Sequence, residues 1–466
     1  MTRLPPVVLI LGSNILLLSC LTGTSAYLER RGLLPAYAEE KLVSSLHSFA
    51  TFRQTSDSWD PMLDAVKQLG SGSKDTVYEE LFFRRKVKFQ YPLTSLLPVW
   101  AALHVLNSTV WVLRILKLLS WLAVLVYVAC VTALPIIQWP PTKGSGPSRF
   151  LICALIGLAG LLFYPMMRAF GLGQLQTIIN AVFAVAFLCY MKGREKVAGL
   201  LIGCLVLLKP QYFLVILWGI LRKRYTFAGT AFICVTAGFV VAVALFGASN
   251  CLDYLRVLSF ISKHGESYYA NQSVNGLLNR MLMNGDNVAW ISNSFPAYNP
   301  IVYAGSLIAA VLLILLSVVL GHYAPGKGSV ADFALVTIAC TVASPVAWEH
   351  HYGVMLPIFV WIFTSNFKIE ARSWFLLFVS YVLIANDWSI TNLTAAHPPV
   401  NILQSYMLVG ALLLVLVLQR LIRCPPPTEP TPNSAGIGTD EPGTPMSAEF
   451  GPLSPARLYG RPWRAI

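Results

Sequence analysis

Residues 227–246 read FAGTAFICVTAGFVVAVALF, a run of 20 residues without a charged side chain. A helix that crosses the hydrocarbon core of a bilayer needs roughly 20 mostly apolar residues, so this stretch is typical of a membrane span. Comparable apolar runs recur along the chain: Val7–Ala26, Leu118–Ile137, Phe150–Phe170, Leu175–Tyr190, Ile301–Leu320, Phe333–Val346, Tyr352–Phe363, Trp374–Ile384 and Ile402–Leu418. The pattern predicts an all-α polytopic membrane protein with about 10–12 transmembrane helices.

The overall composition excludes an ordinary soluble protein. Of the 466 residues, 56% are hydrophobic and only 12% are charged, and the mean hydropathy is +0.63. The net charge of +13 does not indicate nucleic-acid binding, because the basic residues are scattered over short loops, as the positive-inside rule expects. The cysteines lie mainly within apolar runs and lack metal-ligand spacing, so they predict neither a metal site nor a disulfide framework.

Clusters of basic residues predict which turns face the cytoplasm. They are Lys192, Arg194 and Lys196, then Arg222, Lys223 and Arg224, then Lys368 and Arg372, and finally Arg420 and Arg423. The polar loops at residues 27–91 and 247–300 are then extracytoplasmic. Together they belong to one transmembrane domain over residues 1–423, and the Pro-rich residues 424–466 are predicted to be a disordered cytoplasmic tail.

Two segments do not fit whole spans. If the basic clusters at Lys192 and Arg222 share one side, Ala198–Leu221 is too short to cross twice, and we expect two half-depth helices that meet at Lys209-Pro210. Three apparent crossings lie between Tyr91 and Gly171 where an even number is required. Either Pro92–Leu106 is a partial element or a later helix is broken.

The first outward loop carries two carboxylates, Asp57 and Asp60, on either side of Ser58-Trp59. A carboxylate above the bilayer can act as a general base for a hydroxyl nucleophile. The alternative is structural: the carboxylates start a helix near Pro61, with Asp60 as its N-cap.

Histidines and a lysine supply the candidate anion contacts. His350 and His351 follow Trp348-Glu349 between two apolar runs, where ionisable groups at a membrane face are functional candidates. A metal site is disfavoured, because neighbouring residues on a helix point about 100° apart. We expect a histidine to hydrogen-bond an anion such as a lipid phosphate. Lys209 either meets an anion at the broken helix or extends to the membrane interface.

The second outward loop offers amides and a guanidinium in Asn271, Gln272 and Arg280. Amides suit sugar hydroxyls and arginine suits phosphate, although the same composition also occurs in plain loops.

The order of these motifs along the chain resembles glycosyltransferase family 87. The resemblance rests on Asp57, Phe89-Gln90-Tyr91-Pro92-Leu93, Gly171-Leu172-Gly173-Gln174, Lys209-Pro210, Asn271-Gln272-Ser273 through Arg280, and Ser344-Pro345 through His350-His351. That family comprises polyprenol-phosphate-mannose-dependent α-mannosyltransferases and their relatives with the GT-C fold. The chain differs from the family pattern at Leu93, where proline is usual, and at Ala347, where serine is common.

The resemblance implies a GT-C-type membrane glycosyltransferase whose extracytoplasmic loops carry the active site. A hexose, mannose first, would pass with inversion from a polyprenyl-phosphate donor to a lipid or glycan acceptor, without a metal or another cofactor. The implied base is Asp57, with Asp60 as the second choice. One of His350 and His351 would contact the donor phosphate, with Lys209 and Arg280 as further contacts; the residues expected to line the pocket are Tyr91, Gln174, Asn271, Gln272 and Trp348.

Two other functions remain open from the sequence. The broken helix at Lys209-Pro210 also suits a multi-span transporter or a flippase for a lipid carrier, and a structural subunit would need no chemistry. The multi-pass pattern predicts a location in the plasma membrane, among membrane lipids.

Overall fold

The structure, a computed structural model, describes residues 6–32, 41–139 and 146–424. Within these ranges every regular element is a helix, which confirms the all-α fold. The predicted tail lies, apart from Cys424, outside the described residues. Nothing in the structure therefore tests whether that tail is disordered.

Five helical segments are long and apolar enough to cross a bilayer. They are α1 (Pro6–Arg30), α5 (Thr109–Gln138), α11 (Tyr225–Phe246), α14 (Pro300–Ile314) with η5 (Leu315–Leu320), and η7 (Val400–Ser405) with α19 (Tyr406–Arg423). A sixth span results if α6 (Gly146–Leu162) and α7 (Tyr164–Gly171), which meet at an angle of 46°, are one bent crossing. The chain is thus a multi-pass membrane protein. The higher number of 10–12 spans stays a prediction, because it requires shorter helices to complete crossings.

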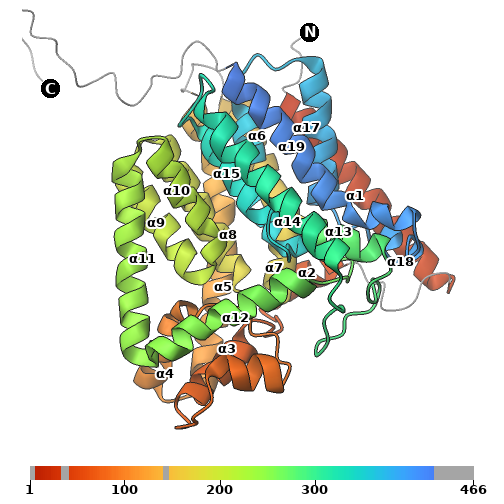
Figure 1. Cartoon of the computed structure of the whole chain (residues 1–466). Helices are drawn as coiled ribbons and strands as arrows, with labels where there is room; N and C mark the ends of the chain where they lie inside the picture. Colours follow the sequence, from red (N-terminus) through yellow and green to blue (C-terminus); the bar gives the residue numbers. More distant parts are fainter. Residues whose placement is uncertain (1–5, 33–40, 140–145, 425–466) are drawn as a thin grey trace, which may run out of the picture. The chain divides into compact units, whose positions relative to one another are not determined.

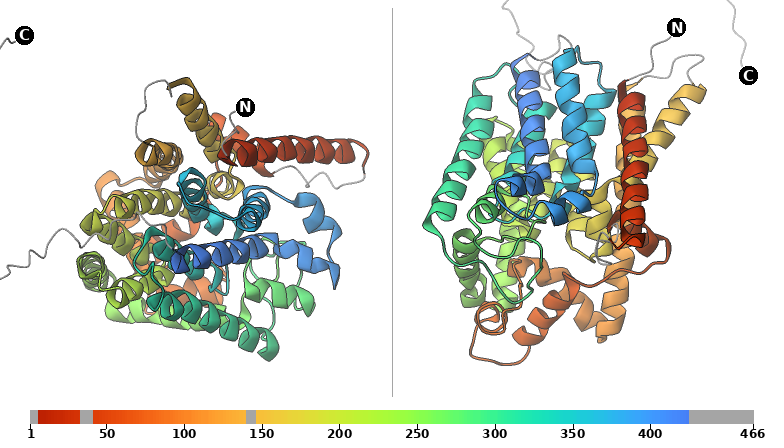
Figure 2. Two further views of the ribbon diagram at one scale, coloured as in Figure 1. Left: turned by 90° about the horizontal axis from the view of Figure 1, so that it is seen from above. Right: turned by 90° about the vertical axis from the view of Figure 1, so that its right-hand side faces the viewer.

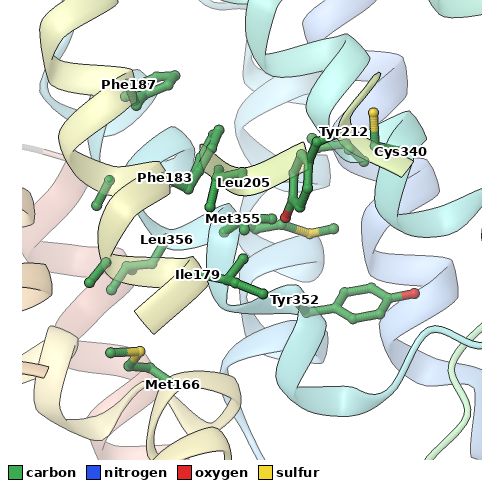
Figure 3. Packing of buried hydrophobic residues seen from close by; sticks show 14 of the residues in the cluster. Met166, Ile179, Phe183, Phe187, Leu205, Tyr212, Cys340, Tyr352, Met355 and Leu356 are labelled. Carbon is green, nitrogen blue, oxygen red and sulfur yellow. The ribbon is translucent and has the colours of Figure 1, made fainter. Parts of the chain in front are cut away.

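Short apolar helices fill the space between the long ones. These are α8 (Gln176–Met191), α15 (Val330–Val342), α16 (Met355–Thr364) and α17 (Ala371–Ala385). All ten residues of α16 are buried, and so are all residues of α15 except Val330. Figure 3 shows this interior, where Ile179 of α8 lies among Met355, Leu356 and Tyr352. α15 and α16 are apolar because protein surrounds them, and they hold the segment between them in place.

The predicted break at Lys209-Pro210 is confirmed. α9 (Glu195–Leu208) ends before Lys209, and η4 (Pro210–Tyr212) leads into α10 (Phe213–Leu221). At 1.5 Å per residue α9 and α10 are about 21 and 13 Å long, each shorter than the roughly 30 Å hydrocarbon core. The chain therefore turns back at Lys209, inside the molecule.

The basic turns gather at one end of the helices. Arg224 forms an ion pair with Glu195 at 3.1 Å and donates a hydrogen bond to the carbonyl of Gly328 at 3.0 Å. The amide of Gly326 in turn donates to the carbonyl of Ile422 at 2.9 Å. Because these contacts join turns that are far apart in sequence, the grouping of basic clusters on one side agrees with the structure.

The opposite end carries the short elements of the two large polar loops: α2 (Lys41–Ala50), α3 (Trp59–Leu69), η2 (Glu79–Arg84), α12 (Ala248–His264) and α13 (Val274–Met281). Three further short helices lie outside those loops: η3 (Leu93–Leu96), α4 (Leu97–Leu106) and α18 (Ser389–Thr394). Figure 1 shows α3, α4 and α12 together at the lower end, and the right view of Figure 2 shows the first loop there beneath the long helices. Pro92–Leu106 consists of the short helices η3 and α4, and α6 and α7 form a bent pair, so each alternative for the crossing number between Tyr91 and Gly171 has a counterpart in the structure.

Candidate functional site

A cavity of about 740 Å³ lies among segments that are far apart along the chain. Its walls come from the turn before α3 with the start of that helix, the segment before η3, the end of α7 with the turn after it, the break after α9, helix α12, the segments on either side of α13, and η6 (Glu349–Val354) with the turn that precedes it. The cavity brings together eight of the eleven predicted site residues: Asp57, Asp60, Tyr91, Gln174, Lys209, Trp348, His350 and His351.

The Asp57 loop is docked on the glycine-rich turn after α7. The backbone amides of Thr55, Asp57 and Ser58 donate to the carbonyls of successive residues in that turn, at 3.1, 3.0 and 3.3 Å; the acceptors are Gly171, Leu172 and Gly173. Gly173 has a φ of +62°, and a Cβ there would lie 2.0 Å from the Thr55 carbonyl oxygen. Only glycine allows so close an approach, so this motif positions Asp57 rather than binding a nucleotide.

A hydrogen-bond network holds the Asp57 carboxylate. The amide nitrogen of Gln174 donates to Asp57 Oδ2, and the Gln174 Oε1 accepts from Ser58 Oγ at 2.7 Å and from Tyr91 Oη at 3.1 Å. Tyr91 Oη lies 2.8 Å from Ser58 Oγ. Tyr91 and Gln174 thus fix the rotamer of the carboxylate from behind and leave it on the cavity wall.

The pKa of Asp57 is raised above its ordinary value of 3.8. The main cause is desolvation by the protein atoms around the cavity, although the residue as a whole is exposed. The hydrogen bond from Gln174 and the charge of Arg168 act in the opposite direction without cancelling the effect. A raised pKa makes the carboxylate a stronger base.

Asp60 is less constrained. Helix α3 begins at Trp59 and its N-cap is Ser58, so the expected N-cap position for Asp60 is wrong. Asp60 lies in the first turn, exposed and on the cavity wall. A negative side chain is favourable there because it meets the helix dipole.

Lys209, at the break after α9, meets the imidazoles of η6. Lys209 Nζ lies 2.5 Å from His351 Nε2 and 2.7 Å from Gln176 Oε1, both neutral groups. The ring of His350 is 4.8 Å from that of His351, and Asn180 of α8 holds the His350 carbonyl at 3.3 Å. With His351 already in contact with Lys209, His350 is the imidazole better placed for a ligand.

Arg168 and Glu349 also line the cavity, and the sequence interpretation assigned neither a role. Glu349 accepts hydrogen bonds from the hydroxyls of Tyr164, at 2.7 Å, and Tyr406, at 2.9 Å. Arg168 follows α7's Pro165-Met166-Met167 within a run treated as apolar. A lone ionisable residue in such a run is the signal that would have found it.

Three predicted residues do not line the cavity. Arg280 is fully buried and donates to Ser405 Oγ at 2.6 Å and to the carbonyl of Asn271 at 2.9 Å. The Asn271 side chain accepts from the amide of Ala347, and the Gln272 amide donates to the Ala347 carbonyl, at 2.9 and 2.8 Å. These residues hold the segment that carries Trp348 and His350 in place, and they do not themselves line the cavity.

The described residues contain no group of three or more His, Cys, Asp or Glu side chains arranged to hold a metal ion. The cationic groups on the cavity wall are instead suited to an anion that brings its own charge, such as a phosphate.

Comparison with known proteins gives a family. The model of glycosyltransferase family 87 matches residues 89–347, more than half of the chain. The matched range includes Tyr91, Arg168, Gln174 and Lys209, whereas the histidines follow shortly after it and Asp57 lies 32 residues before it. No curated protein matches the sequence.

Proposed function

The chain belongs to glycosyltransferase family 87, and we propose that it transfers a hexose, mannose first, from a polyprenyl-phosphate donor to a lipid or glycan acceptor. Membership makes the protein a membrane glycosyltransferase with a sugar donor and an acceptor. The donor, the sugar and the residue roles are the proposal.

One observation carries it: a single cavity is lined by a carboxylate and by cationic and imidazole groups. Asp57 is held by Gln174, whereas Lys209 and His350 come from the broken helix and η6. An inverting transfer needs a base beside the acceptor hydroxyl and partners for a departing phosphate, on opposite sides of the sugar.

The reaction is one displacement. Asp57 takes the proton of the acceptor hydroxyl, whose oxygen bonds to the anomeric carbon while the bond from that carbon to the donor phosphate oxygen breaks. The phosphate leaves as an anion, so it requires no strong acid, and His350, Lys209 and Arg168 supply hydrogen bonds and positive charge. Because the donor carries a single phosphate, no bridging metal is demanded.

The orientation follows from charge. The basic turns lie at the end opposite to the first polar loop and its cavity, and basic loops stay in the cytoplasm. We therefore assign the cavity to the extracytoplasmic face of the plasma membrane.

The test uses the purified full chain with labelled polyprenyl-phosphate-mannose and total membrane lipids or glycans as acceptors. Asp57→Asn should lower transfer by about a hundredfold or more, as expected for loss of a general base. His350→Ala should weaken the use of the donor. Asp64→Asn, in the same helix region but outside the cavity lining, should leave transfer unchanged.

Full activity in both Asp57→Asn and Asp60→Asn would refute the assignment of the base. Movement of the labelled lipid between leaflets, without a new covalent product, would instead identify a flippase.

A further inference from the structure

The cavity lining includes residues that the proposed reaction does not use. Besides Lys209, Arg168 and His350, the cavity is lined by Lys88, Tyr268, Trp290 and Trp348. The three aromatic residues Tyr268, Trp290 and Trp348 are called the aromatic wall below. Its three rings come from the segment between α12 and α13, the segment between α13 and α14, and the turn before η6.

Trp290 is the most accessible member of the aromatic wall, with 43% of its surface exposed. Lys88 Nζ lies 3.8 Å from the centre of the indole ring. Trp348 meets the same ring edge-on at 5.1 Å and 81°, and Tyr268 is 5.7 Å away. The indole therefore contacts a cation and two aromatic rings, and it also lines the cavity.

The segment that carries Trp290 is fixed on both sides. The Asn287 side chain donates to the Ala396 carbonyl at 2.7 Å, and the Tyr269 amide donates to the Asn287 carbonyl at 2.9 Å. Beyond Trp290, Lys88 Nζ donates to the Ile291 carbonyl at 3.1 Å. An exposed indole held this firmly has lost its conformational entropy before any ligand arrives, which favours binding.

The part of the cavity that the aromatic wall lines is suited to a neutral ligand. Lys88 is the cation here, and Glu266 Oε2 lies 2.8 Å from its Nζ, with both side chains about nine-tenths buried. A charge matched in this way offers little to a second anion. What faces the cavity is aromatic surface, with the amide side chain of Gln90 beside it.

We propose that Trp290 is the platform of an acceptor subsite, on which a sugar ring of the acceptor stacks while its hydroxyl reaches Asp57. The C–H groups on one face of a pyranose are apolar and slightly positive, and they match the negative face of an indole. The acceptor is accordingly a glycoside, not a plain lipid alcohol. This inference rests on the proposed transferase function and narrows its acceptor class.

The position relative to the base fits this role. Lys88, which touches Trp290, is three residues from Tyr91, which belongs to the Asp57 network. Three extended residues cover at most about 10 Å, so the backbones of Lys88 and Tyr91 lie within that distance, and Trp290 and Asp57 line the same cavity.

The experiment compares octyl α-D-mannopyranoside with 1-octanol as acceptors for polyprenyl-phosphate-mannose. The wild-type protein should use the mannoside and not the alcohol. Trp290→Leu keeps an apolar side chain without a ring face, so it should raise the KM for the mannoside about tenfold and leave the KM for the donor unchanged. Trp290→Phe should restore most of the loss.

Trp111→Leu is the matched control, because Trp111 is also exposed, at 56%, and also lies under a cation, Arg114, at 4.7 Å, but it does not line the cavity. An unchanged mannoside KM in Trp290→Leu, or equal use of octanol and the mannoside by the wild type, would overturn the subsite and leave the transferase function standing. If the wild type transferred mannose to neither these probes nor total membrane acceptors, the transferase function itself would fail.

Discussion

The protonation of Asp57 sets the proposed reaction, because only the carboxylate can accept the proton of a hydroxyl. Its pKa is raised mainly by poor solvation. The acid limb of the rate profile should therefore lie above pH 3.8, the ordinary value, and activity should fall as the pH drops through the raised pKa. Transfer rates measured across the acid range, with donor and acceptor saturating, check the position of this limb.

Gln174→Glu sharpens that prediction. The new carboxylate would replace the amide that donates to Asp57 Oδ2, so a stabilising hydrogen bond is lost and a like charge is gained. Both changes raise the pKa of Asp57, and the acid limb should shift to higher pH. Asp64→Asn serves as the unshifted reference. A limb that stays in place in Gln174→Glu would show that another group controls the rate.

The two arginines show what single residues reveal from sequence. Arg280 was expected to contact phosphate because it lies in a polar loop. Its guanidinium instead donates hydrogen bonds to the carbonyl of Asn271 and the hydroxyl of Ser405. Arg168 lines the cavity but is hidden in an apolar run. Residue type and order predicted eight of the residues that line the cavity, whereas the direction in which each side chain points depends on packing between distant segments.

Among the elements, the glycine turn after α7 tests how Asp57 is positioned. Gly173→Ala must adopt a left-handed φ, which costs about 1–2 kcal/mol, and its Cβ would overlap the Thr55 carbonyl. The loop has to move, so we expect a lower melting temperature and a loss of transfer of at least about tenfold. Thermal unfolding and the transfer assay measure the two effects.

Gly193→Ala separates conformation from contact. Gly193 has a similar φ of +67°, but no atom lies within 4 Å of the added Cβ. This variant should lose a comparable amount of folding free energy to its left-handed backbone conformation and remain active. Its melting temperature should be higher than that of Gly173→Ala. Normal activity in Gly173→Ala would mean that the docked turn does not position the base.

The helices divide into those that the sequence could place and those it could not. The break at Lys209-Pro210 followed from charge, since two basic clusters on one side require the chain to turn back between them. The number of spans did not follow. α15 and α16 are apolar because protein covers them, and an apolar run looks the same whether lipid or protein surrounds it.

For the molecule as a whole, the separation of its two ends is the decisive property. The basic turns are tied together by contacts such as Arg420 Nη1 to Ser373 Oγ at 2.9 Å, and the site loops gather opposite to them. The separation of the two ends matters for the proposed reaction, because the proposed lipid-linked donor would have to meet its acceptor on the side where the cavity opens.

Cysteine labelling tests that arrangement. In a background without the nine native cysteines, Ser73→Cys places an exposed thiol beside α3, and Lys192→Cys places one at the basic end. In intact cells a membrane-impermeant maleimide should label only Ser73→Cys, and permeabilised cells should show labelling of both. Equal transfer activity would verify that each variant is folded. Labelling of Lys192→Cys alone in intact cells would reverse the orientation and place the cavity on the cytoplasmic side.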